Sequence, residues 1–139
     1  EAGPGGPVLR LAETFLDSSG KPCLQASMRY AFCPEEVQVD FRVEAVGRAL
    51  RLTTLPRVGA SFAAAPELSR LTWLGCGPGE SYPDRKAASD LGVHCGDVDD
   101  QHVEYLVPQE NGGKADVRWA ALTDPQERGR GLLLRYACG

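Results

Sequence analysis

Three acidic residues near the middle of the chain, Glu80, Asp84 and Glu110, are the first candidates for chemistry. Hydrolysis of a glycosidic bond needs two carboxyl groups about 5–10 Å apart, one as the acid and one as the base or nucleophile. Glu80 and Asp84 lie in a stretch rich in glycine and proline, where a carboxylate usually accepts backbone N–H bonds or pairs with an arginine such as Arg85. We therefore expect these two residues to stabilise a turn rather than to catalyse a reaction.

The run from His94 to His102 contains two His, one Cys and three Asp within nine positions. This spacing matches neither a standard zinc site nor a calcium-binding loop, so a solvated acidic loop is the preferred interpretation over a divalent metal site. The 5 cysteines of the chain include no Cys-x-x-Cys pair, and no lysine follows the glycines near Pro78 to meet a phosphate. The sequence thus indicates no metal and no cofactor.

Four aromatic side chains could stack on a sugar ring: Trp73, Tyr82, Tyr105 and Trp119. Trp73 and Trp119 have apolar neighbours in strand-like sequence, which favours core packing. Tyr82 lies in a loop and is the better candidate for sugar contact.

The elements that must position these residues are mostly strands, because apolar residues recur at every second position. The clearest run is Val37 to Ala45, which predicts a half-buried strand of an antiparallel sheet. An earlier run through Leu9, Leu11 and Phe15 alternates less cleanly, because Glu13 falls on its apolar side. A hairpin turn at Asp17–Gly20 separates this run from a second strand at Cys23–Phe32. Further predicted strands are Arg51–Thr54, Val58–Ala63, Leu71–Cys76, Val103–Val107, Val117–Leu122 and Leu132–Ala137.

Only Asp84–Leu91 reads as a short helix, with Pro83 near its start. Residues 1–7, which read EAGPGGP, are expected to be a flexible linker or terminus, and residues 8–139 one domain. Many short strands separated by turns indicate an all-β protein with an antiparallel β-sandwich.

Composition excludes several classes of protein. The chain has 139 residues and a net charge of −4, which argues against nucleic acid or an anionic membrane as the partner. No stretch approaches the roughly 18 apolar residues of a membrane span. The only asparagine, Asn111, is not in a glycosylation motif, and most cysteines are expected to be small buried hydrophobic residues. These features favour a cytoplasmic location.

Two motifs in the second half carry a family resemblance. Residues 73–85 read WLGCGPGESYPDR and are similar to the W-L-G-x-G-P-x-E-x-Y-P-D-R signature of LacZ-type β-galactosidases of glycoside hydrolase family 2. Residues 108–112, PQENG, resemble the P-x-E-N-G segment of the same family, and a strand from Val117 to Trp119 follows. The resemblance extends more weakly toward the front of the chain, over Tyr30–Ala45 and Leu55–Phe62.

The resemblance implies the N-terminal part of the C-terminal "small chain" module, about half of a galactose-mutarotase-like supersandwich. In that family the catalytic carboxylates lie on a separate (β/α)₈ barrel, which takes about 200 residues or more and has no counterpart here. The implied function is a non-catalytic module that supports galactoside hydrolysis or binds carbohydrate, with no hydrolysis by the chain alone. Its candidate contacts with carbohydrate or with the barrel are Glu80, Tyr82, Asp84, Arg85, Glu110 and Asn111.

Two alternatives remain open. One is a free-standing carbohydrate-binding or protein-interaction domain that has lost the enzyme, with a homo-oligomer formed through an exposed sheet edge. The other is a sugar epimerase, for which His94 or His102 with Glu110 would supply the acid and the base.

Overall fold

In the computed structural model, strands account for most of the regular structure. It describes residues 2–3, 6–47, 59–106, 111–126 and 131–135. The strands are β1 (Ala2–Gly3), β2 (Gly6–Leu16), β3 (Pro22–Phe32), β4 (Val37–Ala45), β5 (Arg70–Gly77), β6 (Asp90–Asp97), β7 (Trp119–Thr123) and β8 (Gly131–Arg135). Among the described residues, Asp99–Gln101 forms the 3₁₀ turn η2. No helix in this part of the chain is long and apolar enough to cross a membrane.

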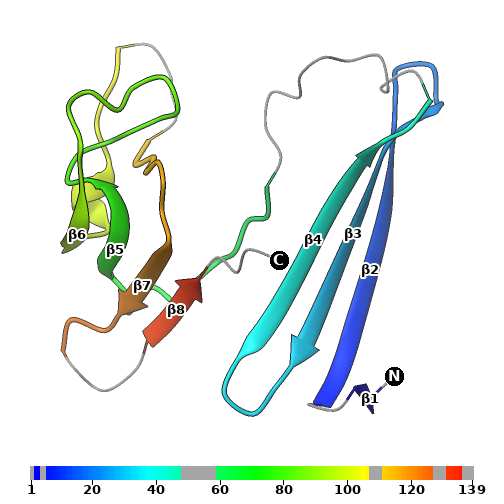
Figure 1. The fold of residues 1–139 in the computed structure, drawn as a ribbon, viewed down its shortest axis with the longest axis horizontal. Coiled ribbons are helices and arrows are strands. Elements are labelled where there is room, and N and C mark those ends of the chain that lie inside the picture. The colour runs from blue at the N-terminus through cyan, green and yellow to red at the C-terminus, as the bar shows by residue number, and fades with distance from the viewer. Residues whose placement is uncertain (1, 4–5, 48–58, 107–110, 127–130, 136–139) are drawn as a thin grey trace. The chain divides into compact units, whose positions relative to one another are not determined.

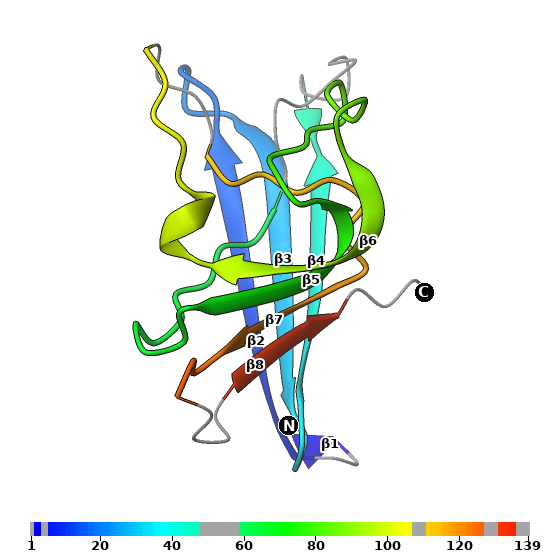
Figure 2. The same ribbon diagram turned by 90° about the vertical axis from the view of Figure 1, so that its left-hand side faces the viewer.

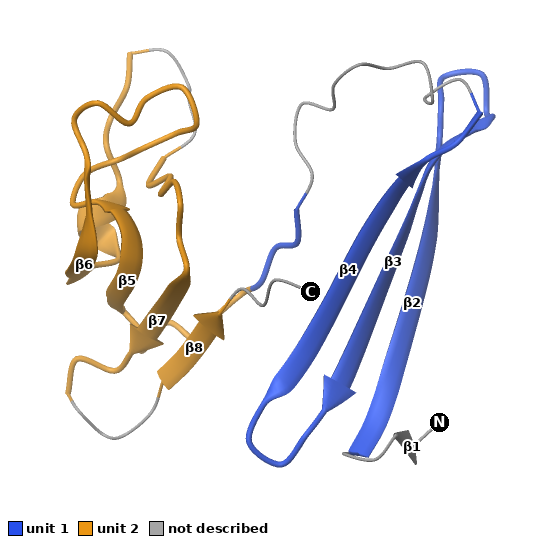
Figure 3. Ribbon diagram, in the orientation of Figure 1, with its two compact units in different colours: residues 1–62 blue, residues 63–139 orange. Residues whose placement is uncertain are grey.

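The chain divides into two compact units, residues 1–62 and residues 63–139 (Figure 3). The first unit holds an antiparallel sheet in the order β1-β2-β3-β4 (Figure 1). The second holds an antiparallel sheet in the order β6-β5-β7-β8, whose strands are seen side by side in Figure 2. The all-β prediction is confirmed, since two antiparallel sheets are the layers of which a β-sandwich is built.

In the first unit, the predicted hairpin is present. The N–H of Asp17 donates to the carbonyl of Lys21 at 2.8 Å, and the Asp17 carboxylate accepts the N–H of Ser19 at 2.8 Å. Gly20 has a φ of 76°, a conformation that glycine adopts without the steric cost of a Cβ. The alternating run at Val37–Ala45 forms β4 as predicted. Strand β2 begins at Gly6, inside the segment for which composition suggested a linker, and pairs with Ala2–Gly3.

The described core belongs mainly to the second unit. Trp73 is 1% exposed, and Cys76 and Ala115 are also buried there, whereas Ala31 is the buried apolar residue of the first unit. Strands β5, β7 and β8 cover most of three predicted strands, which are, in the same order, Leu71–Cys76, Val117–Leu122 and Leu132–Ala137.

The helix predicted at Asp84–Leu91 is wrong. Tyr82 and Arg85 exchange backbone hydrogen bonds of 3.2 and 2.9 Å around Pro83 and Asp84, which closes a tight turn. Strand β6 then begins at Asp90 and pairs with β5 along its whole length. Pairing with a buried neighbouring strand therefore overrides the local helical pattern, and His94 and Cys95 lie in a strand rather than in an acidic loop.

Two predicted strands are also incorrect where the structure describes them. Residues 59–63 and residues 103–106 have no strand pairing. The N–H of Val103 is instead taken by the side-chain oxygen of Asn111 at 2.7 Å, so it is not available to a sheet. The predicted strand Arg51–Thr54, together with Val58 and Val107, lies outside the described residues.

Candidate functional site

The motif-bearing segments meet in the second unit. The loop from β5 to β6 (residues 78–89) is bonded to residues 111–118, which precede β7. Ser81 donates its N–H to the carbonyl of Gly113 at 2.9 Å, and its Oγ accepts the N–H of Ala115 at 2.8 Å. Ser81 is 1% exposed, so these bonds are shielded from water. We call these two segments and their contacts the loop cluster.

The glycines of the motif serve close packing within this cluster. Gly75 lies within the predicted strand Leu71–Cys76, and Gly75 and Gly77 both belong to β5. A Cβ at Gly75 would lie 3.0 Å from the Cα of Val117, and one at Gly77 would lie 2.6 Å from the His94 ring. Small size, rather than turn formation, explains glycine at these two positions.

Glu80 is the central acceptor of the cluster. Its carboxylate accepts the phenol O–H of Tyr105 and the N–H of Gly112, the latter at 2.6 Å. The Tyr105 hydrogen bond, followed by that from Gly112, holds the pKa of Glu80 below its usual value. The same bond to Glu80 raises the pKa of Tyr105. Both carboxylate oxygens are therefore engaged in holding segments of the chain together.

Tyr82, Asp84 and Arg85 form the tight turn beside Glu80. The Tyr82 ring packs on Gly113, where a Cβ would lie only 2.4 Å from Cε1. Asp84 and Arg85 are exposed. Tyr82 and Arg85 also contribute to lowering the pKa of Glu80. The structure thus brings four of the six candidates, Glu80, Tyr82, Asp84 and Arg85, into one loop.

The remaining two candidates belong to the second motif. The Asn111 side chain fixes the backbone of Val103, as described above, and precedes the Gly112 that binds Glu80. Glu110 lies outside the described residues.

Sequence reasoning missed an ion pair on the same cluster. The Lys86 ammonium lies 2.8 and 3.0 Å from the two carboxylate oxygens of Asp116. This pairing lowers the pKa of Asp116 and raises that of Lys86. Burial is the main cause of a raised pKa at Cys76, whose thiol contacts the Asp116 carboxylate at 3.6 Å. Asp116 has a φ of 54°. Thirty residues separate Lys86 from Asp116, and no sequence pattern connects them.

Trp73 is buried beside the loop cluster, which agrees with the prediction of core packing. Its indole N–H donates to the carbonyl of Cys76 at 3.0 Å. The His94 ring lies 5.4 Å from the Trp73 ring, and the Lys114 ammonium lies 4.9 Å from it. Burial lowers the pKa of Lys114. A buried indole with these neighbours is not a platform for a sugar ring.

The run from His94 to His102 does not assemble a metal site in the described structure, where no group of three or more His, Cys, Asp or Glu could hold an ion. His94 Nε2 contacts the carbonyl of Asp90 at 3.1 Å, and His102 is an exposed residue that follows η2. The loop cluster is therefore a scaffold of hydrogen-bonded and ion-paired groups. It can hold a turn rigidly, because its carboxylates Glu80 and Asp116 are both engaged in bonds within the chain.

Comparison with known proteins agrees with the motifs that meet in this cluster. Residues 9–137 match the family model described as "Beta galactosidase small chain". The chain is 46% identical over 81 residues to a β-galactosidase of Priestia megaterium, covering 58% of this chain and 8% of that protein. It is 30% identical to the β-galactosidase BgaC of Bifidobacterium adolescentis, covering 96% of this chain. The chain spans only 8 to 14% of the length of these relatives. Since the family model matches nearly the whole sequence, the chain belongs to the β-galactosidase small chain family.

Proposed function

We propose that this chain is a non-catalytic module that supports galactoside hydrolysis by a catalytic domain outside the sequence. The observation that carries the proposal is the hydrogen bonding of Glu80, the acidic residue at the centre of the galactosidase-like motif. Its two oxygens are occupied by Tyr105 and Gly112. A general acid or nucleophile must instead face the substrate and change its bonding during the reaction.

The mechanism we propose is positional. Hydrogen bonds through Ser81 and Glu80 fix the loop cluster, and this fixes the exposed turn at Asp84 and Arg85. A rigid turn can contact a catalytic domain or the edge of a galactoside pocket without paying the entropy of ordering at each binding event. In this proposal Tyr82, Glu110 and Asn111 complete the contact region, and residues 8–139 act as one module of a glycoside hydrolase family 2 enzyme.

The relatives support the proposal through their length. They are β-galactosidases, and this chain corresponds to 8–14% of each of the two described above. Most of such an enzyme therefore lies outside the matched region, which leaves room for the catalytic domain elsewhere.

A chimera tests the function. The region of the Bifidobacterium adolescentis β-galactosidase BgaC that aligns with this chain, an alignment that covers 96% of the chain, is replaced by the chain, and hydrolysis of a chromogenic galactoside is measured. We expect activity in the chimera and none in the purified chain. Glu80→Gln in the chimera should lower its activity, because the loop cluster loses its charged acceptor. The matched control is Glu104→Gln, at an exposed residue outside these bonds.

Two results would contradict the proposal. Hydrolysis by the purified chain would place catalytic residues within it. A folded chimera with no activity would show that the module cannot support the enzyme.

The alternative is a free-standing carbohydrate-binding or interaction domain. It predicts heat of binding when the purified chain is titrated with galactose or lactose, or a stable oligomer in sedimentation. We favour the supporting role, because the buried Trp73 offers no stacking surface. We also propose a cytoplasmic location, which suits the exposed free thiol of Cys95.

A further inference from the structure

The second motif contains a reactive pair of residues. Asn111 is followed by Gly112, and Asn111 is the only asparagine of the chain. In an Asn-Gly pair, the backbone nitrogen of the glycine can attack the side-chain amide carbon of the asparagine, because glycine has no Cβ to shield that nitrogen. Asparagine is accordingly one of the thermolabile residues of proteins. The pair is therefore a candidate site of covalent modification.

The loop cluster requires both members of this pair. Gly112 has a φ of 70°, which favours glycine, and a Cβ on it would lie 3.2 Å from the carbonyl oxygen of Gln101. The side-chain oxygen of Asn111 accepts the N–H of Val103 at 2.7 Å. An apolar residue in place of Asn111 would leave the Val103 N–H without this bond. The reactive pair thus follows from the structure of the cluster itself.

The carboxylate of Glu80 opposes the reaction. Its Oε1 accepts the N–H of Gly112 at 2.6 Å. The Gly112 nitrogen must lose its proton before it attacks, and the electron pair left behind would point along the former N–H bond, toward Glu80. Hydrogen bonds from Tyr105 and Gly112 lower the pKa of Glu80, so the carboxylate is ionised at neutral pH. Its negative charge disfavours a second negative charge on the adjacent nitrogen.

We propose that Asn111 is a deamidation site, which the Glu80 carboxylate keeps unreactive while the loop cluster is closed. When the bond between Glu80 and Gly112 opens, water removes the proton from the Gly112 nitrogen. The nitrogen forms a bond to Cγ of Asn111, and the bond from Cγ to Nδ2 breaks. Nδ2 takes up a proton and leaves as ammonia, and a second water opens the cyclic imide to aspartate or isoaspartate. The inference does not depend on the supporting role proposed above.

Deamidation changes the loop cluster permanently. Both products add a negative charge to it. Isoaspartate also carries the main chain through the former side chain, which inserts a methylene between positions 111 and 112 and moves the Gly112 N–H relative to Glu80. The amount of isoaspartate therefore records how much of the time Glu80 has released Gly112, because the reaction proceeds only from the open form.

The test measures deamidation of the full, folded chain incubated at neutral pH. Samples are digested with trypsin, and the peptide that follows Lys86 and ends at Lys114 is analysed by mass spectrometry, since conversion of Asn111 adds about 1 Da. Electron-transfer fragmentation identifies isoaspartate. We expect Asn111 to deamidate at least about tenfold more slowly in the folded chain than in the same peptide isolated beforehand, because a hydrogen bond to a charged group favours the closed form by about this factor.

Variants test the role of Glu80. Glu80→Gln keeps the size of the side chain but removes the charge that strengthens its bond to Gly112, so Asn111 should deamidate about fivefold faster or more. Glu67→Gln is the matched control, because it makes the same change at an exposed residue of the same unit outside the loop cluster, and it should leave the rate within about twofold. Asn111→Gln moves the amide one methylene further away and should show no measurable conversion at this position.

Ser81→Ala separates the Glu80 contact from general stability. It weakens the same loop cluster but leaves the bond between Glu80 and Gly112 in place, so the rate should rise less than in Glu80→Gln. Urea unfolding confirms that each variant is folded during the incubation. Equal rates in the folded chain and the isolated peptide would overturn the inference, and this comparison needs no variant. An unchanged rate in folded Glu80→Gln, or an equal rise in Ser81→Ala, would overturn it as well.

Discussion

The loop cluster depends on one buried hydroxyl, and its removal should have a measurable cost. The Oγ of Ser81 accepts the N–H of Ala115 at 2.8 Å, Ser81 is 1% exposed and Ala115 9%. Ser81→Ala removes the acceptor but no other heavy atom, so the N–H stays buried without a partner. Leaving one such group unpaired costs about 1–3 kcal/mol, and we expect the free energy of unfolding to fall by about 2 kcal/mol.

Urea unfolding monitored by tryptophan fluorescence measures this change. Both tryptophans, Trp73 and Trp119, belong to the second unit, so the signal reports on the unit that holds Ser81. With a denaturant dependence of about 1–3 kcal/mol per molar urea, a loss of 2 kcal/mol lowers the midpoint by about 0.7–2 M. Ser89→Ala is the control, because Ser89 is half-buried and its hydroxyl bonds no described residue. It should change the stability by less than about 0.5 kcal/mol.

The reasoning fails if Ser81→Ala unfolds at the midpoint of the unmodified chain with the same slope. In that case the hydroxyl bond would not connect the two segments of the loop cluster in solution. Ser81→Cys offers a second check. It keeps an atom of similar position but a weaker acceptor, so its midpoint should fall between those of Ser81→Ala and the unmodified chain.

Three further predictions concern the same unit. Gly113→Ala places a Cβ 2.4 Å from the Tyr82 ring and should lower the free energy of unfolding by about 1–3 kcal/mol. Adding Tyr82→Ala removes the ring and should recover part of this loss, which a double-mutant cycle measured by urea unfolding would show. Hydrogen bonds in the folded state lower the pKa of Glu80. Its contribution to the free energy of unfolding is therefore present in full above the unfolded pKa of about 4.3 and is lost as the pH falls through the folded pKa. Glu80→Gln should therefore flatten the acid side of a stability–pH curve, and an unchanged slope would argue against this role. Cys95 is exposed and Cys76 6% exposed, so peptide mass spectrometry should find Cys95 alkylated well before Cys76 in the native chain, and equal rates would contradict the burial.

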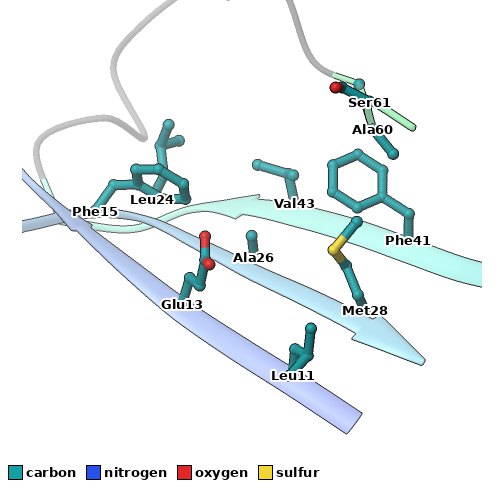
Figure 4. Close-up of a pocket in the computed structure, with 11 residues that line it drawn as sticks. Leu11, Glu13, Phe15, Leu24, Ala26, Met28, Phe41, Val43, Ala60 and Ser61 are labelled. Carbon is teal, nitrogen blue, oxygen red and sulfur yellow. The ribbon is translucent and has the colours of Figure 1, made fainter. Parts of the chain in front are cut away.

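Local patterns were sufficient where a residue's neighbours in sequence decide its conformation. Alternation along Val37–Ala45 predicted β4, since a strand with one apolar side shows that side in the sequence. The turn at Asp17–Gly20 was also predictable, because its carboxylate and its glycine act within five residues. The same holds for Glu13, whose place with Leu11 and Phe15 on the apolar side of its strand could be read from the alternation (Figure 4).

Strand β6 shows where local patterns fail. Its sequence, Asp90–Asp97, contains Gly92 and Gly96 and has little of the β-branched character of a strand. Strand β6 forms because its backbone pairs with β5 along its whole length, although its own sequence does not favour a strand. The helix predicted over Asp84–Leu91 was wrong for the same reason, because the weak local preference competed with a long-range ladder.

The sequence by itself determined the family and the all-β class, because motif spacing and the two-residue period of apolar residues can be read without knowing any contact. It also indicated that Glu80 lies among turn residues. Only the tertiary structure decided which atoms Glu80 binds, since Tyr105 and Gly112 are 25 and 32 residues away along the chain. The pairing of Lys86 with Asp116 likewise became visible only in space. Hydrogen bonds and ion pairs act over a few ångströms, and the folding of the backbone, not the order of residues, brings such groups within that distance.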